Sequence, residues 1–332
     1  MSDQENLLEV RDLVTEFKTD SGWVRAVDGV SFNVPKGKTV GIVGESGCGK
    51  SVTSMSIVDL LPKPMGHTRG GEILFKGRDL RKITHKDYYK IRGGQISVIF
   101  QEPMTALNPV HKIGRQLSEV LLLHTSMTKQ EAWQESIDVL RKVGIPAPER
   151  RVNEYPHQLS GGMRQRVVIA MALACKPDLV IADEPTTALD VTVQAEILDL
   201  INSLQKEMGM SVIMITHDLG VIAETCDEVV VMYAGRVVER GPVRTIFKNP
   251  THDYTRSLLK SIPSLDSPQK STLATIPGTV ASINNFVEGC RFCQRMERNE
   301  EGQKQRPPFI ELAEAHWVED CPVCNAQHQT VS

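Results

Sequence analysis

The chain has 332 residues, of which 40% are hydrophobic and 24% are charged, and its formal net charge is −3. This length predicts about two domains, or one large domain with an appendage, around an ample core. The near-neutral charge argues against a general electrostatic surface for nucleic acid. The sequence contains no apolar run of about 18 residues that would span a bilayer. Residues 1–6 are acidic and polar, unlike a signal peptide, so we expect a cytosolic protein.

Two apolar, β-branched segments open the chain. Residues 8–17 and 24–34 predict strands, and the polar residues between them predict a turn. An antiparallel pair ahead of a nucleotide site could place an aromatic ring against the base. Phe17 is the first candidate and Trp23 the second, and ordinary packing of either ring is the alternative.

A phosphate loop follows the short strand predicted for residues 38–43. It matches the pattern G-x-x-x-x-G-K-[ST] with Gly44, Glu45, Ser46, Gly47, Cys48, Gly49, Lys50 and Ser51. Residues 52–61 can continue as a helix, and this strand, loop and helix order supports the motif over a chance glycine-rich turn. We expect Lys50 to contact the β- and γ-phosphates and the Ser51 hydroxyl to bind Mg²⁺. The sequence therefore predicts a nucleotide site.

A further buried-type strand, residues 96–100, follows the strand predicted for residues 70–77 and ends at Gln101. A polar residue at the carboxyl end of such a strand faces the ligand crevice of an α/β sheet. Gln101 is therefore a candidate contact for Mg²⁺ or the attacking water, and a simple loop amide is the alternative. Residues 102–155 show helical spacing only, which predicts a helical insert.

Three more segments end or begin in polar groups. Ser160, Gly161 and Gly162 open an apolar helix, whose free N–H groups can bind an anion. The strand 179–182 is followed by Asp183, positioned to hold Mg²⁺ through water, and by Glu184, free to deprotonate the attacking water. The strand 211–216 is followed by His217. A solvated turn for the paired acids and a structural role for the histidine are the alternatives.

In this order, these pieces resemble the ATP-binding-cassette (ABC) ATPases. The resemblance covers residues 7 to about 260 and includes the phosphate loop, Gln101, Leu159 to Gly162, Asp183-Glu184, Ala188-Leu189-Asp190 and His217. It implies an α/β P-loop ATPase core with an antiparallel β subdomain and an α-helical subdomain at about residues 102–176. It also implies a head-to-tail dimer that sandwiches two ATP molecules.

The same resemblance assigns roles to single residues. Ser160, Gly161 and Gly162 would bind the γ-phosphate held by the partner. Glu184 would be the general base, and His217 would clamp the γ-phosphate and the water. Asp190 would link the two sites across the dimer.

A narrower resemblance points to the ATPase subunits of bacterial dipeptide and oligopeptide importers. It rests on residues 101–109, residues 249–259, Ile276-Pro277-Gly278 and Gly289-Cys290-Arg291-Phe292. It implies a second, homologous ATPase subunit, two membrane permease subunits and an external peptide-binding protein, with this chain peripheral at the cytoplasmic face of the inner membrane. Nickel importers share these pieces, and a soluble ABC ATPase without a permease is the other alternative.

Four of the seven cysteines lie in the last 43 residues of the chain. We divide the chain into a nucleotide-binding domain, residues 1–260, and a linker with a small C-terminal extension, residues 261–332. Cys290 and Cys293 form one C-x2-C pair, and Cys321 and Cys324 form the other, which predicts one four-thiolate site.

The spacing alone favours zinc in this site. Some peptide-importer ATPases hold a [4Fe-4S] cluster in such an extension, and on that resemblance we expect the cluster, with zinc or free thiols as alternatives. Many members place the second cysteine near the position of Met296 rather than Cys293. His316 is a spare ligand candidate.

Overall fold

The computed structural model describes residues 5–187, 189–262 and 275–326. The predicted motif residue Ala188 lies outside these residues. The predicted linker, which begins at Ser261, lies outside them except for its first two residues. The described residues form two compact units. The phosphate-loop unit contains those of Leu8–Asn33, Thr39–Asp79 and Ile215–Ser332, and the helical unit contains those of Met1–Leu7, Val34–Lys38 and Leu80–Met214.

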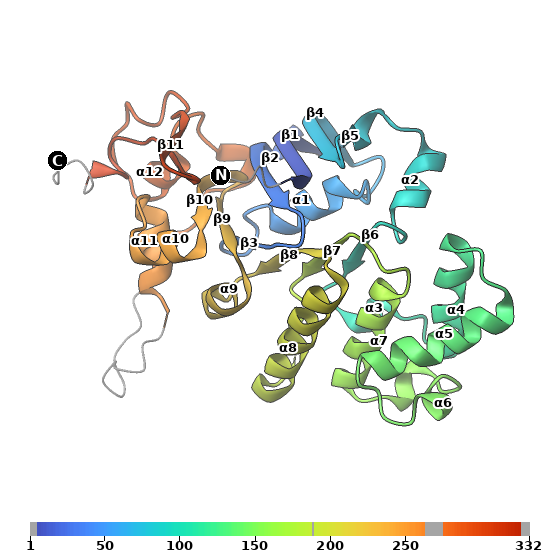
Figure 1. The fold of residues 1–332 in the computed structure, drawn as a ribbon. Coiled ribbons are helices and arrows are strands. Elements are labelled where there is room, and N and C mark those ends of the chain that lie inside the picture. The colour runs from blue at the N-terminus through green and yellow to red at the C-terminus, as the bar shows by residue number, and fades with distance from the viewer. Residues whose placement is uncertain (1–4, 188, 263–274, 327–332) are drawn as a thin grey trace. The chain divides into compact units, whose positions relative to one another are not determined.

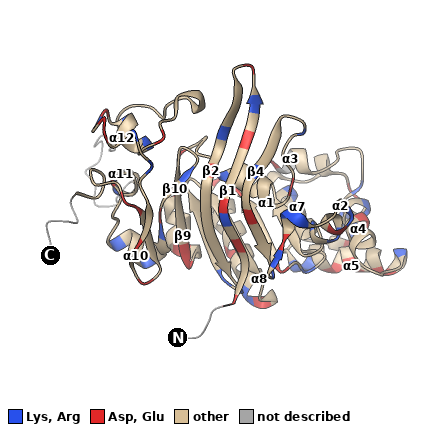
Figure 2. Ribbon diagram, turned by 90° about the horizontal axis from the view of Figure 1, so that it is seen from above, with Lys and Arg blue, Asp and Glu red and all other residues tan. Residues whose placement is uncertain are grey.

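An antiparallel sheet in the phosphate-loop unit confirms the strands predicted at the start of the chain. Its strands are β1 (Asn6–Thr19), β2 (Gly22–Pro35), β4 (Gly66–Phe75) and β5 (Arg78–Asp79), in the order β2-β1-β4-β5. Figure 2 shows β2, β1 and β4 running side by side. The Thr15 and Ser56 hydroxyls lie 2.8 Å apart, and this contact joins β1 to α1 (Lys50–Ile57), the helix after the phosphate loop.

A second sheet carries the phosphate loop and receives the C-terminal extension. In this unit β3 (Thr39–Val43) pairs in parallel with β9 (Glu228–Tyr233), which pairs in antiparallel with β10 (Arg236–Pro242). Strands β12 (His316–Glu319) and β11 (Phe309–Ala313) extend the sheet beyond β10. The unit also contains α9 (Leu219–Thr225), α10 (Val243–Lys248), α11 (Asp253–Lys260), η3 (Ile283–Asn285) and α12 (Arg291–Arg295). The four C-terminal cysteines share a hydrophobic core with residues of β9, α10 and α11.

The helical unit confirms the helical insert. Between β6 (Ile96–Ile99) and β7 (Leu179–Asp183), which pair in parallel, lie α3 (Pro103–Ala106), α4 (Ile113–His124), α5 (Lys129–Lys142), α6 (Pro148–Arg151), η2 (Pro156–Gln158) and α7 (Gly161–Leu173). Figure 1 shows α4, α5, α6 and α7 gathered together. The other elements are η1 (Leu80–Lys82), α2 (His85–Ile91), α8 (Val191–Met208) and β8 (Ser211–Thr216).

Helix α8 is the main element that the sequence patterns did not predict. Its signals are ordinary ones: the Asp190 side chain accepts a hydrogen bond from the Val193 N–H, and Gly209 ends the helix in the left-handed region at φ 65°. Ile197, Leu198, Ile201 and Leu204 are buried along one face. These positions are three to four residues apart, so the sequence did carry a helical signal here.

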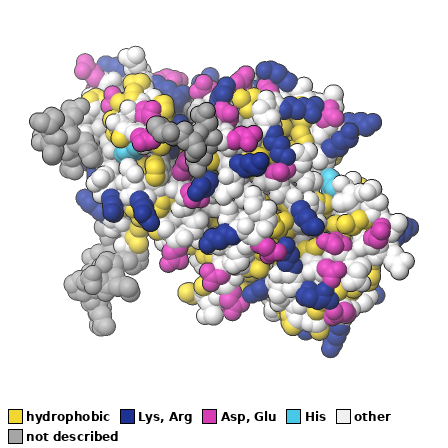
Figure 3. All heavy atoms as spheres, in the orientation of Figure 1, with side chains coloured by type: hydrophobic (Ala, Val, Ile, Leu, Met, Phe, Trp, Pro, Cys, Tyr) yellow, Lys and Arg dark blue, Asp and Glu magenta, His cyan; other side chains and the backbone are white. Residues whose placement is uncertain are grey.

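The surface carries both signs of charge. On the face in Figure 3, basic and acidic side chains are interspersed, in keeping with the net charge of −3. Among the described residues, none of the helices is both long and apolar enough to span a membrane.

Candidate functional site

The phosphate loop runs from the end of β3 to the start of α1. Gly49 stands at the helix N-cap with φ 102°, and a Cβ there would lie 2.8 Å from the Ala26 carbonyl oxygen. A Cβ at Gly44 would overlap the Met232 carbonyl oxygen. Both positions therefore require glycine, and Ser46 and Gly47 are exposed at the tip of the loop.

Lys50 lies folded over its own loop. Its side-chain ammonium donates to the carbonyl oxygens of Gly44 (2.7 Å) and Glu45 (3.1 Å), and the residue is only 5% exposed. Cys48 is buried beside it, and burial raises the pKa of the thiol, which keeps it neutral. The loop thus holds one buried cation close to its backbone, which is suited to binding phosphate oxygens.

The two candidate base-stacking rings lie in different surroundings. Phe17 is half-buried opposite Gly66, and a Cβ at Gly66 would lie 2.8 Å from the Phe17 ring. Trp23 is 41% exposed, and the Arg69 guanidinium lies 4.4 Å from its ring centroid. The base-stacking role of Phe17 stays a prediction.

The predicted nucleotide residues divide between the two units. His217 belongs with the phosphate loop to the phosphate-loop unit, where it is exposed directly after β8. Next to it, the Asp218 side chain caps α9 by accepting from the N–H groups of Gly220 and Val221. Gln101, Asp183, Glu184 and the Ser160-Gly161-Gly162 run lie in the helical unit, whereas Phe17 lies in the phosphate-loop unit.

In the helical unit, Gln101 and Glu184 lie together. The Gln101 amide donates to a Glu184 carboxylate oxygen at 3.0 Å, and the Thr187 hydroxyl donates to the same oxygen at 2.9 Å. Glu184 has φ 46°, a left-handed conformation that side chains rarely adopt. Such strain typically persists where it serves a function. Asp183, the last residue of β7, is 6% exposed.

The Ser-Gly-Gly run begins a helix, as predicted. Ser160 is the N-cap of α7, and its hydroxyl accepts from the Met163 N–H at 3.3 Å. Gly161 and Gly162 are its first two residues, and a Cβ at Gly162 would lie 2.9 Å from a Val193 methyl group. The start of a 13-residue helix therefore offers free N–H groups next to small residues.

The four cysteines of the extension converge as predicted. Their sulfur atoms lie 3.7 Å apart for Cys290 and Cys324, 3.5 Å for Cys293 and Cys321, and 3.6 Å for Cys293 and Cys324. All four side chains are fully buried. Cys293 is thus a member of the set, whereas Met296 packs against it from outside.

This spacing tests the two metal candidates. Four thiolates about 2.3 Å from one zinc ion in a tetrahedron lie roughly 3.8 Å from one another. The observed separations match that arrangement. In a [4Fe-4S] cluster each thiolate binds a different iron atom, so the sulfurs must stand farther apart. The residues therefore fit a single tetrahedral ion, and the expected cluster gains no support from them.

Two histidines of the same unit are buried, His252 and His316. His316 does not join the thiolates, because its Nε2 lies 2.9 Å from the Glu239 carboxylate. His252 Nδ1 accepts from the Tyr254 N–H, and its Nε2 lies 3.9 Å from Glu319. Burial lowers the pKa of His252 to about 4, so this imidazole is neutral. Among the described residues the four sulfurs form one group that could hold a metal ion, and His252, Cys290 and Glu319 form another, with ligand atoms within 4.8 Å of one another.

Three residues of the C-terminal region contact the phosphate loop or its support, and the sequence patterns did not predict these contacts. Arg295 forms an ion pair with Glu45, the Tyr254 hydroxyl accepts from the Glu45 N–H, and Arg291 donates to the Ala234 carbonyl oxygen. Only the spacing of the two arginines, one turn apart around Cys293, hints at a shared role.

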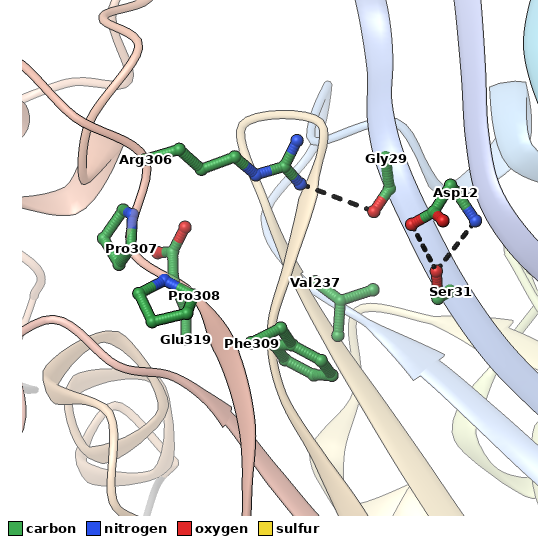
Figure 4. A pocket seen from close by; sticks show the side chains of 9 residues that line it. All are labelled: Asp12, Gly29, Ser31, Val237, Arg306, Pro307, Pro308, Phe309 and Glu319. Carbon is green, nitrogen blue, oxygen red and sulfur yellow. Dashed lines mark hydrogen bonds between the residues drawn. The ribbon is translucent and has the colours of Figure 1, made fainter.

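A pocket of about 300 Å³ with a mixed polar and apolar lining lies elsewhere in the phosphate-loop unit. Figure 4 shows the hydrogen bond from Arg306 to the Gly29 carbonyl oxygen and the hydrogen bond between Ser31 and Asp12. No residue of the predicted nucleotide or thiolate sites lines it. We assign it no role.

Comparison with known proteins agrees with this geometry. The family described as "ABC transporter" matches residues 27–187, and the one described as "Oligopeptide/dipeptide transporter, C-terminal region" matches residues 238–302. The oligopeptide transport ATP-binding protein OppD of Bacillus subtilis (strain 168) is 51% identical over 94% of this chain and 87% of its own length. The dipeptide transport ATP-binding protein DppD of the same organism is 53% identical over 88% of this chain and 87% of its own length.

A solved structure shows the same fold. The dimeric ATP-binding cassette MJ0796, in a post-hydrolysis state with ADP and Pi, superposes with a TM-score of 0.64. The two are 28% identical, over 71% of this chain and 99% of that one. The chain therefore belongs to the ABC transporter family of ATPases, as its motifs predicted. Within that family it belongs with the peptide transporter ATP-binding proteins OppD and DppD.

Asp28 is the buried carboxylate that anchors Arg291. It is 3% exposed, and it accepts hydrogen bonds from Arg236 (2.9 Å) and Arg291 (2.7 Å). Burial alone would raise the pKa of Asp28, but the two guanidinium groups outweigh burial and lower it. A carboxylate whose pKa is lower in the folded state stabilises the fold above its unfolded pKa of about 3.9.

We predict that Asp28→Asn lowers the free energy of unfolding at neutral pH by about 3–5 kcal/mol, because it leaves buried guanidinium groups without their counter-charge. The difference from wild type should shrink as the pH falls below about 4 and Asp28 protonates. Urea unfolding at a series of pH values measures it, with the exposed Asp20→Asn as control. A difference that does not change with pH would contradict this account.

Proposed function

We propose that this chain is the ATP-binding subunit that hydrolyses ATP to power the uptake of dipeptides or oligopeptides through an ABC importer. The observation that carries the proposal is the similarity to OppD over 94% of the chain, which extends through the C-terminal region. Relatives named for peptide transport favour this function over nickel import. They also favour it over a soluble ATPase without a permease.

In this proposal the phosphate loop holds the β- and γ-phosphates through Lys50. Ser51, Gln101 and Asp183 hold Mg²⁺. The hydrogen bonds from Gln101 and Thr187 orient the Glu184 carboxylate, which deprotonates the attacking water. His217 contacts the γ-phosphate.

The remaining proposals concern the assembly. Ser160, Gly161 and Gly162 bind the γ-phosphate held by a second, homologous ATPase subunit. Two permease subunits and an external peptide-binding protein complete the importer, and the chain is peripheral at the cytoplasmic face of the inner membrane. The nucleotide-binding domain spans residues 1–260, with its helical subdomain at about 102–176, and the extension spans 261–332.

We predict that Glu184→Gln abolishes ATP hydrolysis and peptide uptake by the assembled importer but leaves ATP binding intact, because only the base is lost. Loss of a general base typically lowers the rate by about 10²–10⁴-fold. Phosphate release and uptake of labelled peptide by membrane vesicles measure the two activities.

The exposed Glu311→Gln is the matched control, and it should retain both activities. Hydrolysis by Glu184→Gln at the wild-type rate would refute the assigned base. Peptide uptake that does not depend on this chain would refute the transport function.

We further propose that the four thiolates hold one zinc ion, with the [4Fe-4S] cluster as the alternative. The separations of 3.5–3.7 Å between sulfur atoms support the single ion. Such a centre would contribute folding energy to the extension, because structural zinc sites do so directly.

We predict that protein purified without oxygen contains about one zinc per chain and no band near ~400 nm, because the sulfur spacing suits a single ion. Metal analysis and the absorption spectrum measure this, and Cys293→Ser should lose the metal. Cys175→Ser, at a cysteine outside the cluster, is the control and should retain it. Four iron and four sulfide per chain would instead establish the cluster.

A further inference from the structure

Helix α12 is too short to keep its orientation by itself. It has five residues, Arg291–Arg295, and isolated helices of this length are not stable in water. Cys290 caps it, with its sulfur accepting from the Cys293 N–H at 3.4 Å. Because Cys290 and Cys293 are two of the four converging thiolates, the thiolate cluster holds the helix at its start and at its middle.

At its last residue, α12 contacts the phosphate loop. The Arg295 guanidinium forms an ion pair with the Glu45 carboxylate at 2.5 Å, and its side chain is only 4% exposed. The other N–H groups donate to the carbonyl oxygens of Pro277 (2.9 Å), Ile276 (3.0 Å) and Gly278 (3.1 Å). Four partners therefore fix one orientation of this side chain.

Two further contacts hold the same loop. The Tyr254 hydroxyl accepts from the Glu45 N–H at 3.0 Å, and the Tyr254 ring packs edge-on against Phe292 of α12, with centroids 5.5 Å apart. Arg291 donates to the Ala234 carbonyl oxygen, and the Gly235 N–H next to it donates to the Cys48 carbonyl oxygen at 2.9 Å. The helix is thus connected to the loop at Glu45 and, through residues 234–235, at Cys48.

The ion pair between Arg295 and Glu45 also compensates the negative charge of Glu45. Glu45 places a carboxylate in a loop that binds an anion, and that charge would repel the phosphates at close range. The Arg295 guanidinium neutralises it and turns it away to the extension side. A loop that is already ordered also binds its ligand without a further entropy cost.

We propose that Arg295 is a positioning residue of the phosphate loop, held in place by the four-thiolate centre, so that the C-terminal extension sets the affinity for ATP. This proposal rests on the proposed function, because it assumes that the loop binds ATP. It does not depend on whether the centre holds zinc or a cluster. The proposal predicts that a change in the C-terminal extension alters nucleotide binding at the phosphate loop.

The test is the affinity of the full chain for a fluorescent ATP analogue. Arg295→Gln should weaken binding by about 2- to 30-fold, the range for residues that couple two sites. The control Arg298→Gln removes an exposed ion pair to Asp253 in the same extension and should stay within about two-fold of wild type. Equal affinity for Arg295→Gln and wild type would overturn the proposal.

A charge rescue separates this role from general damage. Glu45→Gln in the Arg295→Gln background should restore part of the affinity, because the uncompensated carboxylate is removed. Arg295→Lys, which keeps the positive charge, should bind more tightly than Arg295→Gln. Metal content of each variant reports whether the extension is folded. If neither change recovers affinity in metal-loaded protein, the electrostatic role is wrong.

The last experiment removes the metal from the four-thiolate centre. Metal-free wild type should lose affinity to about the level of Arg295→Gln, and the variant should lose little more. Unchanged affinity of the metal-free wild type would show that the centre does not hold Arg295. Failure of the untreated wild type to bind the analogue at all would instead refute the proposed function.

Discussion

The phosphate-loop unit depends on guanidinium groups that are buried around the phosphate loop and its supporting strands. Arg291 and Arg236 share the Asp28 carboxylate, and Arg295 binds Glu45 of the loop. Burying such charges is costly unless each is paired and hydrogen-bonded, and here carbonyl oxygens supply most of the remaining partners. Residues that contact the loop or the strands that support it therefore lie more than 180 positions away in the sequence, at 236, 291 and 295.

This dependence separates what the sequence could predict from what it could not. The phosphate loop, its flanking strand β3 and its helix α1 were predicted, because a contiguous motif and strong local periodicity specify them. The polar residues after β6 and β7 were predicted to lie at the ligand edge of a sheet, and the Gln101–Glu184 hydrogen bond joins two of them. The left-handed backbone of Glu184 has no sequence signal, because glutamate rarely adopts this conformation.

The C-terminal extension could be predicted only in part. Paired C-x2-C motifs predicted one four-thiolate site, and the sulfur atoms do converge. The identity of the metal did not follow, because zinc and an iron–sulfur cluster accept the same four ligands. Only the distances between the sulfur atoms distinguish them. The contacts of Tyr254 and Arg295 with the loop were likewise missed, because long-range ion pairs leave no periodic pattern in a sequence.

We expect the thiolate centre to keep the phosphate loop ordered through α12. Amide hydrogen exchange of the loop, residues 44–51, measures this order, because exchange reports local opening. We expect faster exchange of this segment in Cys293→Ser and in Arg295→Gln than in wild type, with Arg298→Gln unchanged. Identical exchange of the loop in all four proteins would contradict the account.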